Sequence, residues 1–170
     1  RMEAQNLPWI LLLLPLLSAV SILLFTKRSG NISALISTGS ALITLVLGLV
    51  LLRMPEGAQV TAFPWLNLGS SLVVEVGFQI DQLSRGMMFV VTAIGAAVHV
   101  FSLAYMKDDE GKSRYFAGLS FFMFSMTGIV FANNFVMMFV FWELVGFSSY
   151  VLIGHWFEKE SAADAAKKAM

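Results

Sequence analysis

Five long apolar runs dominate this sequence and restrict the folds that are open to it. The run at 32–52 contains 21 residues and no charged side chain, and about 20 apolar helical residues cross a hydrocarbon core of about 30 Å. The runs at 9–26, 82–106, 115–132 and 134–154 have a similar character. Because lipid tails offer the backbone no hydrogen-bond partners, such segments must be helical. We therefore predict an all-α membrane protein with about five transmembrane helices, organised as one membrane domain over 1–170.

A different periodicity separates the second and third runs. Residues 74–80 alternate apolar and polar side chains, which is typical of a strand rather than a helix. The turn-rich stretch NLGSS precedes them, and QVTAFPWL lies further upstream. We predict a small β-hairpin at about 58–80, outside the bilayer, where its edges can find water or a partner subunit.

Composition agrees with a membrane location and excludes several functions. Hydrophobic residues make up 58% of the chain and charged residues 13%, whereas soluble domains have about 25% charged residues. A net charge of zero argues against binding nucleic acid. The absence of cysteine excludes disulfides and iron–sulfur ligation by this chain, and the two histidines lie far apart, so we expect no metal site.

The distribution of basic residues predicts the orientation in the membrane. Short loops on the cytoplasmic side of membrane proteins carry an excess of Lys and Arg. If the N-terminus lies outside, eight basic residues fall inside and three outside. The inner residues are Lys27, Arg28, Lys107, Lys112, Arg114, Lys159, Lys167 and Lys168, and the outer ones are Arg1, Arg53 and Arg85. We therefore expect the N-terminus outside. The charged stretch 107–114 is predicted to be a solvated loop, or alternatively a docking surface for a peripheral subunit.

Glu143 is the leading candidate for function. It is the tenth residue of the run 134–154 and so lies near the middle of a predicted transmembrane helix. A charged side chain at that depth costs about 2.5–3.5 kcal/mol on insertion scales, and such residues usually mark proton or ion pathways. Gly146 and Tyr150 follow on the same helical face. Glu143 could carry a proton, with Tyr150 as an accessory; alternatively, it could only hydrogen-bond across a helix interface and hold the packing.

Three other polar residues, in or directly before the third run, are weaker candidates. Asp81 and Arg85 are spaced for an i,i+4 ion pair at the start of that helix, and Asp81 could also cap it. The pair could instead line a polar path. His99, nearer the other end, could relay protons or could simply be a hydrogen-bonded packing residue. No phosphate-binding glycine motif occurs, so we expect no bound NADH or ATP.

The segment FWELVGFSSYVLIGHWFEKESAADAAKKAM resembles one protein family. Its W-E pair at mid-helix, the following G-x-x-S-Y-x-L-I-G and the A-A-x-K-A segment are similar to the antiporter-like subunit L of respiratory complex I, also called NADH dehydrogenase subunit 5. DQLSRGM and YM…EGKSRYFA add to the resemblance, which covers essentially the whole chain and matches the N-terminal part of the family. The stretch SAADAAKKAM is then expected to begin a further helix, with Ser161 as its N-cap.

The resemblance implies a function and a set of partners. Glu143 would be the family's functional glutamate, which pairs with a lysine on a later helix and takes part in redox-coupled proton translocation. This chain itself would hold no cofactor, and NADH, FMN, iron–sulfur clusters and quinone would belong to partner subunits. Its partners would be other membrane-arm subunits, especially the neighbouring antiporter-like subunit, in the bilayer of an energy-coupling membrane, either the bacterial inner membrane or an organellar inner membrane. The alternatives are the large subunit of a multisubunit cation/proton antiporter, or a scaffold that transports nothing.

Overall fold

Five long helices form the body of the protein. The computed structural model describes residues 2–53, 62–67 and 73–169. The helices that are long and apolar enough to cross a membrane comprise α1 (Met2–Ser21) with its π-helical extension η1 (Ile22–Thr26), α2 (Gly30–Leu51), α3 (Gln82–Tyr105), α4 (Lys112–Phe131) and α5 (Phe135–Ile153). The predicted all-α membrane fold with five spans is confirmed.

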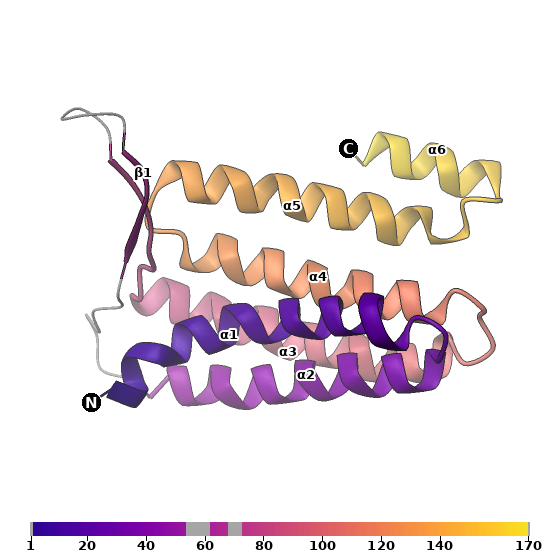
Figure 1. Cartoon of the computed structure of the whole chain (residues 1–170), viewed down its shortest axis with the longest axis horizontal. Coiled ribbons are helices and arrows are strands. Elements are labelled where there is room, and N and C mark those ends of the chain that lie inside the picture. Colours follow the sequence, from indigo (N-terminus) through magenta and orange to yellow (C-terminus); the bar gives the residue numbers. More distant parts are fainter. Residues whose placement is uncertain (1, 54–61, 68–72, 170) are drawn as a thin grey trace.

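The long helices run side by side, and their connections gather at the two ends of the bundle (Figure 1). Helix α4 packs against α1, α2, α3 and α5, and it is the most buried of the five. Helix α5 is the least buried, because it packs mainly on α4. We call the end with the strands the hairpin end, and the end with residues 27–29, 106–111 and 154–159 the loop end. Among the described residues, α5 is therefore open on most of its sides.

A two-stranded antiparallel sheet lies between α2 and α3, as predicted. Strand β1 (Phe63–Asn67) pairs with β2 (Val73–Val76), and the register shifts between Pro64 and Leu66. The rest of the predicted hairpin, at 58–61 and 68–72, lies outside the described residues. After β2, the Gln79 amide donates to the Phe131 carbonyl at 3.0 Å, and Asn134 Nδ2 donates to the Glu75 carbonyl at 2.7 Å. These bonds attach the hairpin to the junction of α4 and α5.

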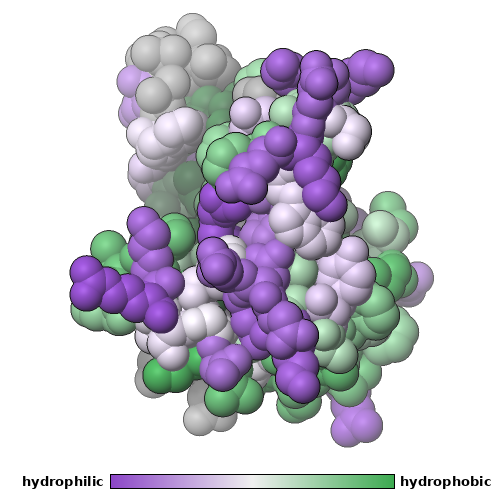
Figure 2. All heavy atoms as spheres, turned by 90° about the vertical axis from the view of Figure 1, so that its right-hand side faces the viewer, coloured by the Kyte–Doolittle hydropathy of each residue, from purple (hydrophilic) through white to green (hydrophobic). Residues whose placement is uncertain are grey.

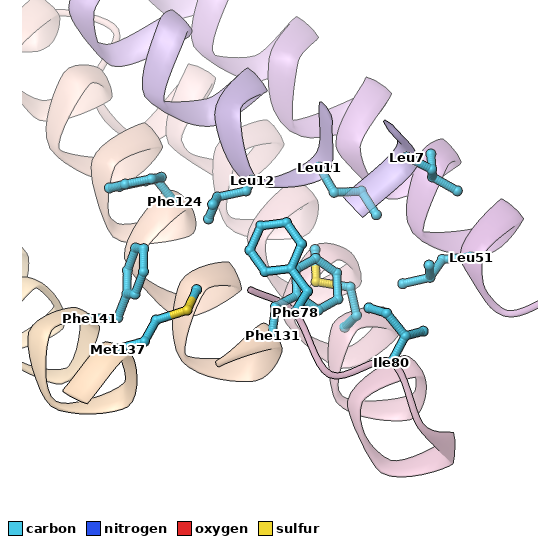
Figure 3. Packing of buried hydrophobic residues seen from close by; sticks show 11 residues of the cluster. Leu7, Leu11, Leu12, Leu51, Phe78, Ile80, Phe124, Phe131, Met137 and Phe141 are labelled. Atoms are coloured by element: carbon cyan, nitrogen blue, oxygen red, sulfur yellow. The ribbon is translucent and has the colours of Figure 1, made fainter. Parts of the chain in front are cut away.

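The larger hydrophobic core lies beside this attachment. It joins α1, α2, α3, α4 and α5 to the segment after β2, and its buried members are Leu7, Leu11, Leu12, Leu51, Phe78, Ile80, Met88, Phe124, Phe131, Met137 and Phe141 (Figure 3). Phe78 stacks against both Trp9 and Phe131. Because one aromatic side chain contacts α1 and α4 together, the hairpin segment is part of the core at this end.

The final helix lies outside the bundle. Helix α6 (Glu160–Lys168) follows a short 3-10 turn, η2 (Gly154–Trp156), and folds back along α5 (Figure 1). It packs there through the buried Ala166, which lies close to Gly154. The expected N-cap at Ser161 is wrong, because the helix begins at Glu160 with Lys159 in the N-cap position and no side-chain cap.

Candidate functional site

Glu143 lies halfway along α5 with its side chain open. It is the ninth of the 19 residues of Phe135–Ile153, and its side chain is exposed. Among the described residues, none forms a hydrogen bond or ion pair with it. The alternative in which Glu143 holds a helix interface is therefore not supported by a contact within this part of the chain.

The open surface extends along α5 from Glu143 towards the C-terminal end of the helix. Gly146 has nothing within 4 Å of the position of an added Cβ atom, and Tyr150 is 39% exposed. We call Glu143, Gly146 and Tyr150 the Glu143 face. The opposite side of α5 packs on α4, where Phe141 and Ser148 are buried. The structure thus brings the predicted carboxylate and its predicted accessory tyrosine onto one face that points away from α4.

Asp81 and Arg85 lie at the hairpin end, at the start of α3. The Ser84 amide donates to Asp81 Oδ1 at 2.7 Å, and the Asp81 amide donates to Ser84 Oγ at 2.8 Å, which forms a capping box. The predicted cap is confirmed. The Ser84 backbone bond, helped by Gln79, lowers the pKa of Asp81 below its ordinary value. Arg85 Nε donates to the Asp81 carbonyl at 3.3 Å.

His99, on α3, is buried against the neighbouring helices. Its Nδ1 lies 2.7 Å from the Gly95 carbonyl oxygen, and its ring borders an apolar cavity of about 360 Å³ that is lined mainly by α3 and α4. Helix α3 packs on α2 and α4. Asp81, Arg85 and His99 are therefore on a different helix from the Glu143 face, and the structure does not bring them into contact with it.

A polar cluster at the loop end was not predicted. Asp109, in the α3–α4 loop, accepts hydrogen bonds from the Gly111 amide at 2.7 Å, from His155 Nε2 at 3.1 Å and from Trp156 Nε1 at 2.7 Å. Burial raises the pKa of Asp109, but the bonds from Trp156, His155 and Gly111 together hold it below its ordinary value. We call these four residues the Asp109 cluster. It ties the end of α5 to the loop before α4.

Basic side chains reinforce the same end. Arg114 donates to the His155 carbonyl at 2.7 Å and lies over the ring of Phe157. Lys112 is buried, and its Nζ donates to Asn31 Oδ1 at 2.9 Å, which joins the start of α4 to the start of α2. Figure 2 shows this end of the molecule, where hydrophilic side chains gather across the surface. The charged stretch 107–114 is therefore packed against α2 and η2 and is not simply solvated.

Buried hydroxyl groups connect three helices along the bundle. Ser33 and Ser113 are 3.0 Å apart at their Oγ atoms, Ser37 and Ser120 are 2.7 Å apart, and Ser18 and Ser120 are 3.2 Å apart. The residues of α2 that supply this line follow helical spacing at 33, 37, 40 and 44, so the sequence carried a signal for it. Nothing in the sequence indicated the Asp109 cluster, because its members lie 46 and 47 residues apart along the chain.

Within residues 2–53, 62–67 and 73–169, no three side chains of His, Asp or Glu come close enough together to hold a metal ion. The candidate site consists of a single carboxyl group on an open helical face.

Comparisons with known proteins identify what the chain is similar to. A family model described as "NADH-Ubiquinone oxidoreductase (complex I), chain 5 N-terminus" matches residues 65–116. A second, described as "NADH:quinone oxidoreductase/Mrp antiporter, TM", matches residues 132–170. Together they cover 65–170 apart from 117–131, which is most of α4.

Curated relatives agree with these models. NADH-quinone oxidoreductase subunit L from Mycobacterium tuberculosis is 37% identical over 168 residues, which cover 95% of this chain and 26% of that protein. Chloroplastic NAD(P)H-quinone oxidoreductase subunit 5 from Zygnema circumcarinatum is 39% identical over 171 residues, covering 95% and 24%. The chain thus spans about a quarter of the length of the curated relatives that it matches.

A solved structure has the same arrangement of helices. The Mrp complex from Dietzia sp. DQ12-45-1b contains a chain that superposes with a TM-score of 0.70 at 26% sequence identity. The match covers 87% of this chain and 16% of that one. The five-helix arrangement is therefore shared between this protein and an Mrp complex.

Proposed function

The chain belongs to the family of complex I chain 5, the antiporter-like subunits L and 5, and from this premise we propose that it works in proton translocation through Glu143. In this proposal, it is part of a membrane-arm subunit of NADH:quinone oxidoreductase and lies next to other antiporter-like subunits. NADH, FMN, iron–sulfur clusters and quinone would be bound by partner subunits. The N-terminus would lie on the outer side of an energy-coupling membrane, as the positive-inside rule predicts.

The observation that carries this proposal is the open position of Glu143. A carboxylate halfway along a membrane helix is costly if it faces lipid tails, so its face has to meet protein or water. The described helices leave Glu143 and Gly146 uncovered and Tyr150 39% exposed, with Gly146 offering a flat surface and Tyr150 a hydroxyl group. This supports a face that receives a further helix, or a hydrated path, in the assembled protein.

The proton chemistry follows from the charge of the carboxyl group. A nearby cation favours the ionised carboxylate, and removal of that cation favours the protonated acid. A glutamate whose cationic partner moves can therefore take up a proton in one state and release it in another. Such an element needs no bound cofactor, and energy would reach it through the movement of the partner.

The test is Glu143→Gln in the intact membrane complex, compared with Glu158→Gln. Glutamine keeps the size and the hydrogen-bonding capacity of the side chain but cannot be ionised. Glu158 is exposed at the loop end, outside α5, so its variant controls for the loss of one carboxylate. We expect Glu143→Gln to assemble normally and to lose most proton pumping, measured as acidification across sealed vesicles, while Glu158→Gln pumps normally. Full pumping by Glu143→Gln would support a scaffold role instead.

The likeness to an Mrp complex favours a second candidate function, a cation/proton antiporter subunit. The two candidates differ in the activity of the assembly. We expect the tagged chain, extracted in mild detergent, to co-purify with NADH:quinone reductase activity. A complex without that activity, whose vesicles exchange protons for sodium, would overturn the complex I assignment and establish the antiporter.

A further inference from the structure

Two buried polar atoms of the bundle interior have no hydrogen-bond partner among the described residues. They are Thr38 Oγ1 on α2 and His99 Nε2 on α3. Both side chains are more than nine-tenths buried, with 6% of Thr38 and 2% of His99 exposed. Polar atoms buried in this way are almost always satisfied by a protein group or by an ordered water, so each of these two requires an explanation.

Contacts between the helices place the two residues at a similar depth. The Oγ atoms of Ser37 and Ser120 are 2.7 Å apart, which puts Thr38 at the level of residue 120 on α4. A Cβ atom added to Gly95 would lie 3.3 Å from Met123 Sδ, and because α4 runs back along α3, His99, four residues after Gly95, lies at the level of residue 119 of α4. At 1.5 Å of rise per residue, Thr38 and His99 lie within about one helical turn of the same level.

The two helices that carry them are in contact. Helices α2 and α3 pack closely, since a Cβ atom added to Gly48 would lie 2.9 Å from Thr92 Oγ1. Small buried side chains occur near the level of Thr38 and His99 on both helices, namely Ala34, Ala41 and Ala96. Small residues let the two helices approach closely, so one small molecule at this level can reach side chains of both.

The contact at the other ring nitrogen decides what His99 Nε2 can accept. Nδ1 lies 2.7 Å from the Gly95 carbonyl oxygen, and a carbonyl oxygen can only accept a hydrogen bond. Nδ1 therefore carries the ring proton, and in the neutral imidazole Nε2 is an acceptor. The Thr38 hydroxyl can both donate and accept. The missing partner must donate to Nε2 and can bond the hydroxyl in either direction.

We propose that Thr38 and His99 together bind one internal water molecule at the junction of α2, α3 and α4. One hydrogen of the water is donated to His99 Nε2, and its oxygen accepts the hydrogen of Thr38 Oγ1. A single water of this kind satisfies both unpartnered atoms, as internal waters generally do.

The water site extends a polar layer that already crosses the bundle. Ser18 of α1, Ser37 of α2 and Ser120 of α4 are hydrogen-bonded at this level, and the water adds Thr38 and His99 of α3. His99 is then hydrogen-bonded at both ring nitrogens, which holds the orientation of its ring. The site lies away from the Glu143 face, and the proposal does not depend on the transport function of that face.

The test is the effect of Thr38→Val on thermal stability in the full-length protein, with whichever subunits co-purify, in lipid nanodiscs. Valine has the shape of threonine and lacks the hydroxyl. If the hydroxyl binds the water, its removal leaves that water with one partner fewer, and we expect a lower unfolding temperature. If the hydroxyl has no partner, its removal relieves a buried polar group, and the protein becomes equally or more stable.

Two matched variants show whether a change in the unfolding temperature of Thr38→Val comes from the loss of its hydroxyl group. Thr127→Val removes another buried hydroxyl, which donates to the Met123 carbonyl of its own helix at 2.9 Å, so it reports the cost of the substitution where only an intrahelical hydrogen bond is lost. Thr38→Ser keeps the hydroxyl, so its unfolding temperature should be closer to that of the wild type than the unfolding temperature of Thr38→Val is. The proposal is supported if the unfolding temperature falls further in Thr38→Val than in Thr127→Val.

The water itself should be visible in a cryo-EM map that resolves other buried waters. We expect a density within hydrogen-bonding distance of both Thr38 Oγ1 and His99 Nε2, and its loss in Thr38→Val. A map without it, or one in which a side chain or lipid bonds these atoms, would overturn the proposal. So would a Thr38→Val protein at least as stable as the wild type.

Discussion

Asp109 is a single residue on which two distant segments depend. It accepts hydrogen bonds from a backbone amide, an imidazole and an indole, and only an ionised carboxylate can accept from all three at full strength. His155, its imidazole partner, is 5% exposed and is also held by Arg114 through its carbonyl. The Asp109 cluster therefore anchors the end of the helix that carries Glu143.

Asp109→Asn is expected to loosen the loop end at neutral pH. The amide loses the charge and one acceptor oxygen, and hydrogen bonds to charged groups contribute about 1.5–3 kcal/mol each. We expect faster hydrogen exchange in the backbone of residues 107–111 and 154–157, measured by mass spectrometry in nanodiscs. Asp108→Asn is the control, because Asp108 is an exposed neighbour. Equal exchange in the two variants would contradict an anchoring role.

Acidification should have the same effect as this substitution. The pKa of Asp109 is lower in the folded protein than its ordinary value of 3.8, so the folded state binds the proton more weakly than the unfolded state does. The stabilisation is therefore complete above pH 3.8 and is lost as the pH falls through the lowered pKa. We expect the protection of the loop end against hydrogen exchange to differ between the wild type and Asp109→Asn at pH 7. The two proteins should become equally protected only below pH 3.8.

Among the helices, α4 organises the bundle through close approaches to its neighbours. A Cβ atom added to Gly118 would lie 3.0 Å from Leu152, and one added to Gly128 would overlap the ring of Phe141. Both glycines let α5 approach α4 closely, as the small residues of membrane helices commonly do. Among the described helices, α6 packs against the C-terminal end of α5, while Glu143, on the side of α5 away from α4, stays exposed.

Gly128→Ala is expected to destabilise the α4–α5 contact. Alanine favours a helix over glycine by about 1 kcal/mol, but overpacking a closed contact costs about 1–3 kcal/mol, so the net effect should be a lower unfolding temperature. Gly86→Ala in α3 is the control, because nothing lies within 4 Å of its added Cβ atom, and it should be neutral or stabilising. Phe141→Leu combined with Gly128→Ala should recover part of the loss. Two glycine variants with equal stability would refute the packing argument.

At the scale of the whole molecule, the two ends differ in charge and in construction. The loop end carries Lys27, Arg28, Lys107, Lys112, Arg114 and Lys159, and hydrophilic groups cover much of its surface (Figure 2). The hairpin end is closed by the larger hydrophobic core and by the two strands (Figure 3). This asymmetry is the physical basis for the proposed orientation, because positively charged loops are retained on the cytoplasmic side.

Cysteine labelling can test that orientation, since the chain contains no cysteine of its own. Lys107→Cys and Trp65→Cys place exposed thiols at the loop end and in β1, respectively. In right-side-out vesicles, we expect a membrane-impermeant maleimide to label position 65 at once and position 107 only after the vesicles are opened. The reverse pattern would place the N-terminus inside.

The sequence by itself determined the five spans, the intervening hairpin, the Asp81 cap and the position of Glu143 near the middle of its helix. These features depend on hydrophobic length, periodicity and capping chemistry, which act between residues close together in the chain. The expected Ser161 cap failed because the helix begins at Glu160 with Lys159 as its N-cap, two residues before the expected position.

Only the tertiary structure decided which face of α5 is open, which buried atoms lack partners among the described residues, and that Asp109 meets His155 and Trp156. The partners in that cluster are 46 and 47 residues apart, and their meeting depends on how α3, α4 and α5 pack together. Likewise, the helical spacing at 33, 37, 40 and 44 marks a polar stripe on α2 but does not say which helix receives it. Packing selects such contacts because it matches the surfaces of whole helices, and local sequence patterns specify only one of the two surfaces.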